Sequence, residues 1–269
     1  MRFLTACLLA VVMTAAAQGQ RILLVGKEVR IRGTANADRV FCENFGGDLV
    51  VVIENDTDFV FDVFLQSEVR NIDCELRAGD DDFDGSRCIV PANVFGGPGD
   101  DILVGTRRRD RILGAGGDDI IFGNTGADGI SGGAGRDFIN GGPHPDYVSG
   151  GNDRDIVIGG SGIDQVIGGA GQDLLIGGDF DEGEGNVGLA SAIWFSGPDD
   201  DFEARVVAIF ETGFSFFADA ANDFMLGGDE ADLFVTDADT VIIDGVGWPS
   251  GNSPPEQGDR VDAVFDVAE

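Results

Sequence analysis

Hydrophobic residues, glycines and aspartates recur every nine residues through the middle of the chain. Residues 96–176 divide into nine consecutive nonapeptides without an insertion, of which GGAGRDFIN at 132–140 is typical. Every block begins with glycine, carries aspartate at its sixth position and carries an aliphatic residue at its eighth. The eighth-position residues are Leu103, Ile112, Ile121, Ile130, Ile139, Val148, Val157, Val166 and Leu175. A repeat locked in phase over nine blocks indicates a solenoid rather than a low-complexity segment.

Each nonapeptide predicts a turn followed by a very short strand. The G-G-x-G-x-D half suits a tight turn that needs positive φ. The next three residues suit a strand whose eighth-position side chain points one way and whose neighbours point the other. A nine-residue period does not fit the rhythm of a helix. Two blocks therefore predict one coil with a strand on each side, and the eighth-position residues meet inside it as a narrow core.

The acidic residues show what such a coil lacks. The chain has 49 Asp and Glu against 17 Lys and Arg, a net charge of −32, which excludes nucleic acid as a natural partner. Stacked turns place aspartate beside aspartate, which is repulsive, and the core is narrow. A divalent cation between the turns would supply the missing stabilisation, and oxygen ligands favour Ca²⁺ over Zn²⁺. A halophilic surface is the alternative explanation of this acidity.

The blocks resemble the G-G-x-G-x-D-x-U-x nonapeptide of the repeats-in-toxin (RTX, hemolysin-type) calcium-binding proteins, where U is an aliphatic residue. The resemblance covers residues 96–176. It implies an all-β fold, a parallel β-roll (right-handed β-solenoid) of stacked nonapeptide repeats with irregular β-rich caps. It also implies several Ca²⁺ ions, each held between turns of adjacent coils by sixth-position aspartates and backbone carbonyls.

Alternate blocks share one side of the roll, so the turns form two columns. The first column starts at Gly96, and its predicted calcium ligands are Asp101, Asp119, Asp137, Asp155 and Asp173. The second column starts at Gly105, with Gly177 as a candidate continuation, and its predicted ligands are Asp128, Asp146 and Asp164. The first column lies closer to the repeat pattern.

Two blocks of the second column depart from the pattern. GTRRRD places Arg107, Arg108 and Arg109 before Asp110, so we expect Asp110 to pair with an arginine instead of calcium. GGPHPD places His144, the single histidine of the chain, where the pattern has glycine. We expect His144 to be a solvated turn residue.

The regions around the array complete the predicted organisation. Residues 1–17 read as a secretory signal peptide, 18–95 as a β-rich N-terminal cap with degenerate repeats, 96–178 as the RTX-type roll, 179–226 as a Phe-rich non-repeat segment, and 227–269 as a degenerate repeat with a C-terminal cap. Degenerate blocks place Asp38, Asp81 and Asp232 at the sixth position. In the N-terminal cap, β-rich runs predict strands over 22–25, 49–53 and 59–65. A separate sandwich domain is the alternative for this cap.

Three cysteines remain after the signal peptide. Cys74 and Cys88 are close in sequence, which favours a disulfide between them if the protein is exported. A buried free thiol is the alternative for each of them and for Cys42. No segment of about 18 consecutive apolar residues follows the signal, so no membrane span is expected.

Positions seven and nine of the first column are strongly apolar, as at Ile120, Phe122, Ile156 and Ile158. Such a face is unusual when it is bare. The segment 179–226 is the candidate lid for it, and a partner or self-association through this face is the alternative.

No catalytic residues are predicted. The chain has no HExxH motif, its single histidine cannot supply a zinc site, and no G-x-S-x-G elbow is present. We therefore expect a non-enzymatic, secreted calcium-binding repeat protein, extracellular or at the cell surface, whose roll folds on binding Ca²⁺ and which has a structural or surface-interaction role. A calcium-dependent accessory module of a secreted toxin or hydrolase is the alternative. Candidate partners besides calcium are a surface glycan, a protein or a second copy.

Overall fold

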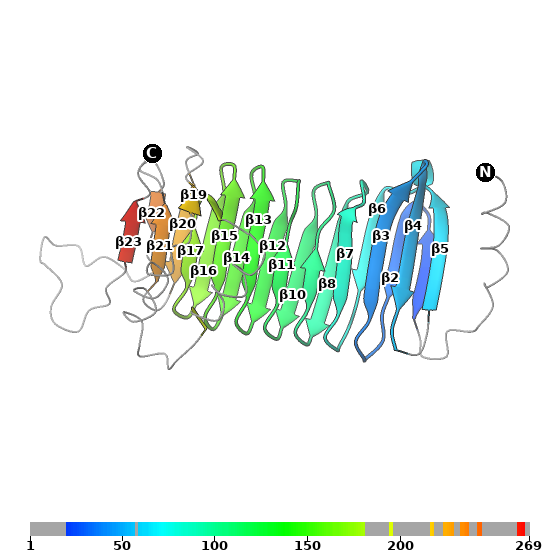
Figure 1. Ribbon diagram of the computed structural model, residues 1–269, viewed down its shortest axis with the longest axis horizontal. Coiled ribbons are helices and arrows are strands. Elements are labelled where there is room, and N and C mark those ends of the chain that lie inside the picture. Colours follow the sequence, from blue (N-terminus) through cyan, green and yellow to red (C-terminus); the bar gives the residue numbers. More distant parts are fainter. Residues whose placement is uncertain are drawn as a thin grey trace, which may run out of the picture.

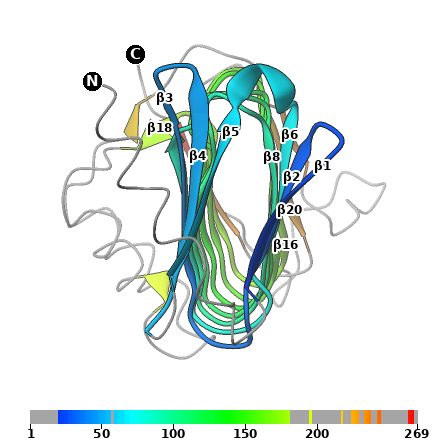
Figure 2. The same ribbon diagram turned by 90° about the vertical axis from the view of Figure 1, so that its right-hand side faces the viewer.

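The chain folds into an elongated roll made of two long sheets that face each other (Figure 1, Figure 2). This computed structural model describes residues 20–56, 59–180, 194–195, 216–217, 223–228, 232–236, 241–243 and 263–266. Within these residues one sheet, sheet A, has ten strands and the other, sheet B, has eleven. The predicted signal peptide and most of the residues between 181 and 222 lie outside the described parts.

The strands alternate between the two sheets along the array. Sheet A contains β1 (Arg21–Val25), β2 (Glu28–Arg32), β6 (Asn71–Glu75), β8 (Ala92–Pro98), β10 (Arg111–Gly116), β12 (Gly129–Ala134), β14 (Tyr147–Asn152), β16 (Gln165–Ala170), β20 (Phe224–Gly228) and β22 (Val241–Ile243). Sheet B contains β3 (Arg39–Phe45), β4 (Asp48–Glu54), β5 (Phe59–Leu65), β7 (Asp82–Arg87), β9 (Ile102–Val104), β11 (Ile120–Phe122), β13 (Phe138–Pro143), β15 (Ile156–Ser161), β17 (Leu174–Ile176), β21 (Leu233–Thr236) and β23 (Ala263–Asp266). A short 3-10 helix (Gln66–Glu68) and a two-stranded sheet of β18 (Asp179–Phe180) and β19 (Phe216–Phe217) complete the described elements.

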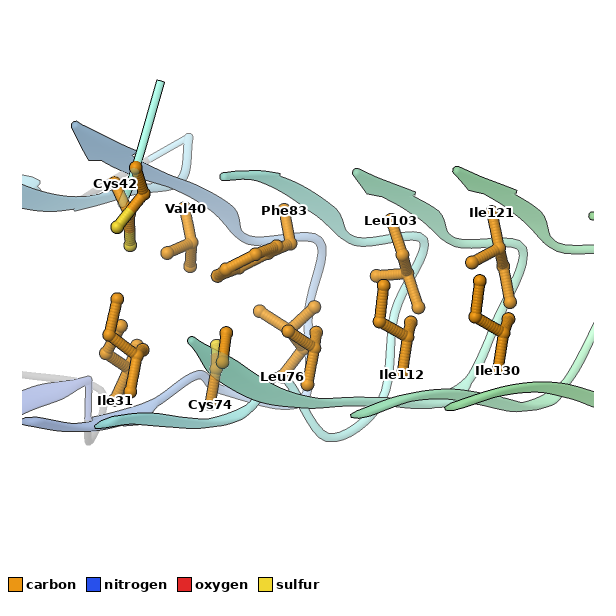
Figure 3. Packing of buried hydrophobic residues seen from close by; sticks show 14 of the residues in the cluster. Ile31, Val40, Cys42, Cys74, Leu76, Phe83, Leu103, Ile112, Ile121 and Ile130 are labelled. Atoms are coloured by element: carbon orange, nitrogen blue, oxygen red, sulfur yellow. The ribbon is translucent and has the colours of Figure 1, made fainter. Parts of the chain in front are cut away.

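The parallel β-roll predicted for the array is confirmed. Strands pair in parallel with the strand two blocks away, so that Ile112 lies beside Ile130 and Ile121 beside Ile139. All nine eighth-position residues are at most 1% exposed. Figure 3 shows how side chains from the two sheets point toward each other across the core, with Val40, Phe83, Leu103 and Ile121 from one sheet opposite Ile31, Leu76, Ile112 and Ile130 from the other.

The N-terminal region uses the same two sheets. β2 pairs in parallel with β6, and β3 pairs in parallel with β7. At the end of the roll the chain turns back in antiparallel hairpins, in which β1 pairs with β2, β3 with β4, and β4 with β5. The bulkier side chains of this end, among them Leu49 and Ile53, belong to one hydrophobic cluster with the array core. The two sheets therefore run without a break from the hairpins into the repeats.

The predicted Cys74–Cys88 disulfide is wrong. Cys42, Cys74 and Cys88 are free and buried. Burial raises the pKa of the Cys88 thiol to about 11, and its sulfur accepts a hydrogen bond from Val90 N–H at 3.3 Å. Buried thiols with raised pKa values are chemically inert, and these three residues act as small hydrophobic side chains in the core.

Part of the apolar outer face of sheet B is buried. Ile156 and Ile158 are at most 1% exposed and pack in a cluster that includes Trp194, itself fully buried. The carbonyl oxygens of Trp194 and Phe195 accept hydrogen bonds from Arg154 Nη1 at 3.3 Å and Arg136 Nη1 at 3.0 Å. Toward the N-terminal end the face opens, since Ile120 is half-buried and Ile102 is 46% exposed. Among the described residues no helix is long and apolar enough to cross a membrane.

Candidate calcium-binding ladders

The turns of the first column carry the chain from sheet A to sheet B, and those of the second column carry it back. Their second and fourth positions adopt positive φ in most blocks, which explains the glycines there. Examples are Gly133 at +129° and Gly135 at +119°. Ala115 and His144 adopt the same backbone at +97° and +91° without being glycine.

Replacing Ala115 with glycine should stabilise the protein. An L-residue at positive φ is strained by about 1–2 kcal/mol, so Ala115→Gly should raise the free energy of unfolding by about 1 kcal/mol. Urea unfolding in saturating calcium measures the change. The control is Ala134→Gly, an exposed position of the next coil without positive φ, which should leave stability unchanged or lower it. Equal effects of the two substitutions would contradict the strain at Ala115.

The sixth-position aspartates form two hydrogen-bonded ladders along the roll, which we call the carboxylate ladders. The backbone N–H of each aspartate donates to Oδ1 of the aspartate in the next coil of the same column. Asp101 N–H donates to Asp119 Oδ1 at 2.8 Å, and Asp128 N–H donates to Asp146 Oδ1 at 2.7 Å. The first ladder comprises Asp38, Asp81, Asp101, Asp119, Asp137, Asp155, Asp173 and Asp232. The second comprises Asp110, Asp128, Asp146, Asp164 and Asp223.

All eight predicted ligands and the three degenerate-block aspartates lie in these ladders. Asp223 lies in the second ladder too, although the nine-residue spacing did not indicate it. Gly177 opens this block, and its aspartate comes 46 residues later instead of five. A methyl group on Gly177 would lie 2.6 Å from Asp223 Oδ2, the same relation that other first-position glycines have to their own aspartates. Residues 178–222 are therefore an insertion within one turn, and residues 223–226, predicted as part of the Phe-rich segment, belong to the roll. The signal was the run DFML at 223–226, which has the D-x-U-x form directly before Gly227.

The second carboxylate oxygen distinguishes these aspartates from ordinary capping residues. In seven of them Oδ2 is buried and accepts no hydrogen bond: Asp81, Asp101, Asp119, Asp128, Asp137, Asp146 and Asp155. In the six that belong to the array, which are all of these except Asp81, Oδ2 lies over the glycine that opens the same block. Over Gly114, Asp119 Oδ2 converges with the carbonyl oxygen of Gly132 from the next coil. A side chain on that glycine would fill this oxygen-lined cradle, which explains why the first position is always glycine.

Burial makes these carboxylates hard to ionise. Desolvation raises the pKa of Asp119 to about 7, of Asp137 to about 8 and of Asp155 to about 10. The hydrogen bond that each carboxylate accepts from a backbone N–H lowers its pKa in part, and the charges of neighbouring aspartates raise the pKa. At Asp155 the largest contribution from a neighbouring charge comes from Asp173. A buried carboxylate with an unused oxygen is unstable as a bare anion, so it either takes up a proton and becomes neutral or remains ionised beside a cation.

The expected pairing of Asp110 with an arginine is wrong. Asp110 instead accepts from Thr106 N–H at 2.5 Å, Thr106 Oγ1 at 2.9 Å and Ala92 N–H at 2.7 Å. Burial raises the pKa of Asp110 only to about 6, because these bonds favour the carboxylate. The arginines turn away, since Arg107 Nε donates to Ser86 O. His144 is exposed in its turn, as predicted.

The donor set fits a hard divalent cation. Each regular turn of the array offers a buried carboxylate oxygen, and at Gly114 the carbonyl oxygen of Gly132 converges with it. Further carbonyl oxygens lie between neighbouring turns, as Ala115 O faces Gly133 and Gly117 O faces Gly135. Carboxylate and carbonyl oxygens in flexible glycine turns suit Ca²⁺. Within the described parts no three His, Cys, Asp or Glu side chains form a metal-binding group. A cation here would therefore rely on backbone oxygens for most of its ligands.

A parallel β-roll with a buried, glycine-cradled carboxylate in each turn defines the class of calcium-binding nonapeptide solenoids. Residues 95–130, 122–157 and 149–181 match the family model described as RTX calcium-binding nonapeptide repeat (4 copies). The stretch 95–181 is therefore an array of RTX calcium-binding nonapeptide repeats. No curated protein and no solved structure matches the chain significantly.

Proposed function

We propose that this is a secreted, non-enzymatic calcium-binding protein whose roll folds when several Ca²⁺ ions bind, with a structural or surface-interaction role. The observation that supports it is the set of seven buried aspartates whose Oδ2 accepts no hydrogen bond. Without a cation, each of these groups opposes folding when it ionises. Calcium would neutralise the ladder and join neighbouring turns.

The proposed ligands are Asp101, Asp119, Asp137, Asp155 and Asp173 in the first ladder and Asp128, Asp146 and Asp164 in the second. Extracellular calcium modules have dissociation constants of about 10⁻⁴–10⁻³ M. At a tenfold excess of calcium each site adds about 1.4 kcal/mol to stability. Several such sites together would decide whether the array is folded.

Far-ultraviolet circular dichroism with and without a calcium chelator tests the proposal. We expect the β signal to fall sharply in chelator and to return on adding calcium, because the ladders lose their counter-ions. Magnesium is the control, and it should restore much less signal because it keeps its waters and demands octahedral geometry. A spectrum that does not change between chelator and calcium would rule the proposal out.

We also infer that the part of segment 179–226 that holds Trp194 and Phe195 covers the outer face of sheet B. The burial of Trp194 beside Ile156 and Ile158, and the hydrogen bonds from Arg136 and Arg154 to this segment, support it. Surface interaction would then involve the exposed part of the face near Ile102. A glycan- or cell-binding assay with and without calcium tests the surface role, and co-purification with a catalytic partner would favour an accessory module instead.

A further inference from the structure

Two turns with the same sequence stand at the start of the two ladders. The first ladder begins with Gly33-Thr34 and Asp38, and the second with Gly105-Thr106 and Asp110, so both blocks read G-T-x-x-x-D. Both threonines are buried, at 2% and 0% exposed. Neither has positive φ, whereas the second position of most regular turns does. A β-branched side chain avoids that backbone, so threonine forces a different turn.

The different turn satisfies the carboxylate from within its own block. Thr34 N–H and Thr106 N–H each donate to Oδ2 of their own aspartate at 2.5 Å. The threonine hydroxyls accept from the fourth-position N–H, of Asn36 and of Arg108, at 3.1 Å in both turns. The oxygen that accepts no hydrogen bond in the seven regular aspartates is therefore occupied in both Gly-Thr turns.

The remaining groups at both ends also have partners. Asp38 Oδ1 accepts hydrogen bonds from Gln20 Nε2 at 2.6 Å and from Asn55 Nδ2 at 3.2 Å. We call each aspartate of a ladder, with its turn, a rung. The two side-chain amides take the place of the backbone N–H that the aspartate of a preceding rung would donate. At the second ladder, Arg107 Nε and Arg108 Nε donate to Ser86 O at 2.9 Å and Ile89 O at 3.3 Å. The exposed side chains of Arg107 and Arg108 thus bind carbonyl oxygens at the end of β7 and in the loop that follows it.

We propose that the two Gly-Thr turns are metal-independent end caps, which exclude calcium from their own rungs and allow residues 20–95, which hold none of the proposed calcium ligands, to fold without calcium as the seed for the array. The inference rests on the proposed calcium-driven folding of the other rungs. The seed has the means to fold alone, because its hairpins bury Leu49 and Ile53 and the adjoining strand β7 buries Phe83. Each regular block contributes one aliphatic residue to the core between the two sheets, and the array depends on the cation.

Calcium stoichiometry separates caps from binding rungs. Calorimetric titration of the full chain should give the same number of sites for Asp110→Asn as for the unchanged protein, while Asp137→Asn loses about one. A loss of one site in Asp110→Asn would overturn the caps and leave the proposed function standing. If Asp137→Asn also keeps every site, the proposed calcium ligands are wrong, and hydrogen exchange then decides the caps independently.

Hydrogen exchange in chelator measures the seed directly. We expect amides of β3, β4 and β6 to stay protected in the full chain while those of β13 to β16 exchange freely. Thr106→Val and Thr34→Val should speed exchange of the seed about tenfold, because buried partners of the hydroxyl are left unsatisfied. The matched variants Thr106→Ser and Thr34→Ser keep the hydroxyl and should stay close to the unchanged protein. Loss of protection in both regions together, or equal effects of valine and serine, would overturn the proposal.

Discussion

The calcium-free protein is expected to regain β-structure as the pH falls from about 8 to about 4. An unfolded aspartate titrates near pH 3.9, whereas burial raises the folded pKa to about 7 at Asp81, Asp119 and Asp128, and to about 10 at Asp155. A folded pKa above the unfolded value means that folding binds protons. The stability from these groups is therefore complete below about pH 4 and is lost as the pH rises through the folded pKa values.

Far-ultraviolet circular dichroism in chelator across this pH range measures the effect. Calcium and protons compete for the same carboxylates, so the calcium needed for folding should increase as the pH falls, and adding calcium near pH 7 should release protons. Asp155→Asn is the internal comparison, because a neutral amide removes the group with the highest folded pKa. Its calcium-free form should persist to higher pH. Unfolding of the calcium-free chain on acidification would contradict this account of the ladders.

Replacing Gly151 with valine should disrupt the roll. Gly151 has a φ of +136°, and a Cβ there would collide with the carbonyl oxygen of Gly133 in the preceding coil and lie 2.9 Å from its carbon. The left-handed backbone alone costs about 1–2 kcal/mol, and the clash is with backbone that cannot rotate away. We expect a loss of about 3 kcal/mol or more, seen as a large fall in the urea midpoint in saturating calcium.

Gly129 provides the matched control for Gly151. It lies in β12 on the outer face of sheet A, without positive φ, and a Cβ there would meet nothing within 4 Å. Gly129→Val should be neutral or mildly stabilising, because a β-branched residue suits a strand. If Gly151→Val and Gly129→Val lowered the urea midpoint by similar amounts, positive φ and the backbone clash at Gly151 would not explain the loss of stability.

The periodic features of the array were predictable because each of them depends on residues at short, fixed separations along the chain. Glycine, aspartate and aliphatic positions nine residues apart indicate turn, ladder and core, and the roll has Ile112 beside Ile130 as that period requires. The outward apolar face of sheet B was also visible from positions seven and nine. What covers Ile156 was open, because the contact with Trp194 joins residues far apart in the sequence.

Two predictions made from charge and from closeness along the chain were wrong. Three arginines before Asp110 suggested an ion pair, yet Thr106 is nearer to the carboxylate once the turn closes. Cys74 and Cys88 are close in the chain, but both thiols are buried and free in the roll. In each case the outcome depends on backbone geometry, which residue type and separation along the chain do not specify.

By itself the sequence determined the period of the roll, the two columns of turns and the identity of most ladder aspartates, since a repeat is defined by residues a few positions apart. Only the tertiary structure decided that Asp223 continues the second ladder across an insertion and that the two Gly-Thr turns satisfy their own carboxylates. The physical reason is that an aspartate's role depends on which donors reach each of its oxygens, and those donors belong to the next coil or to the local turn.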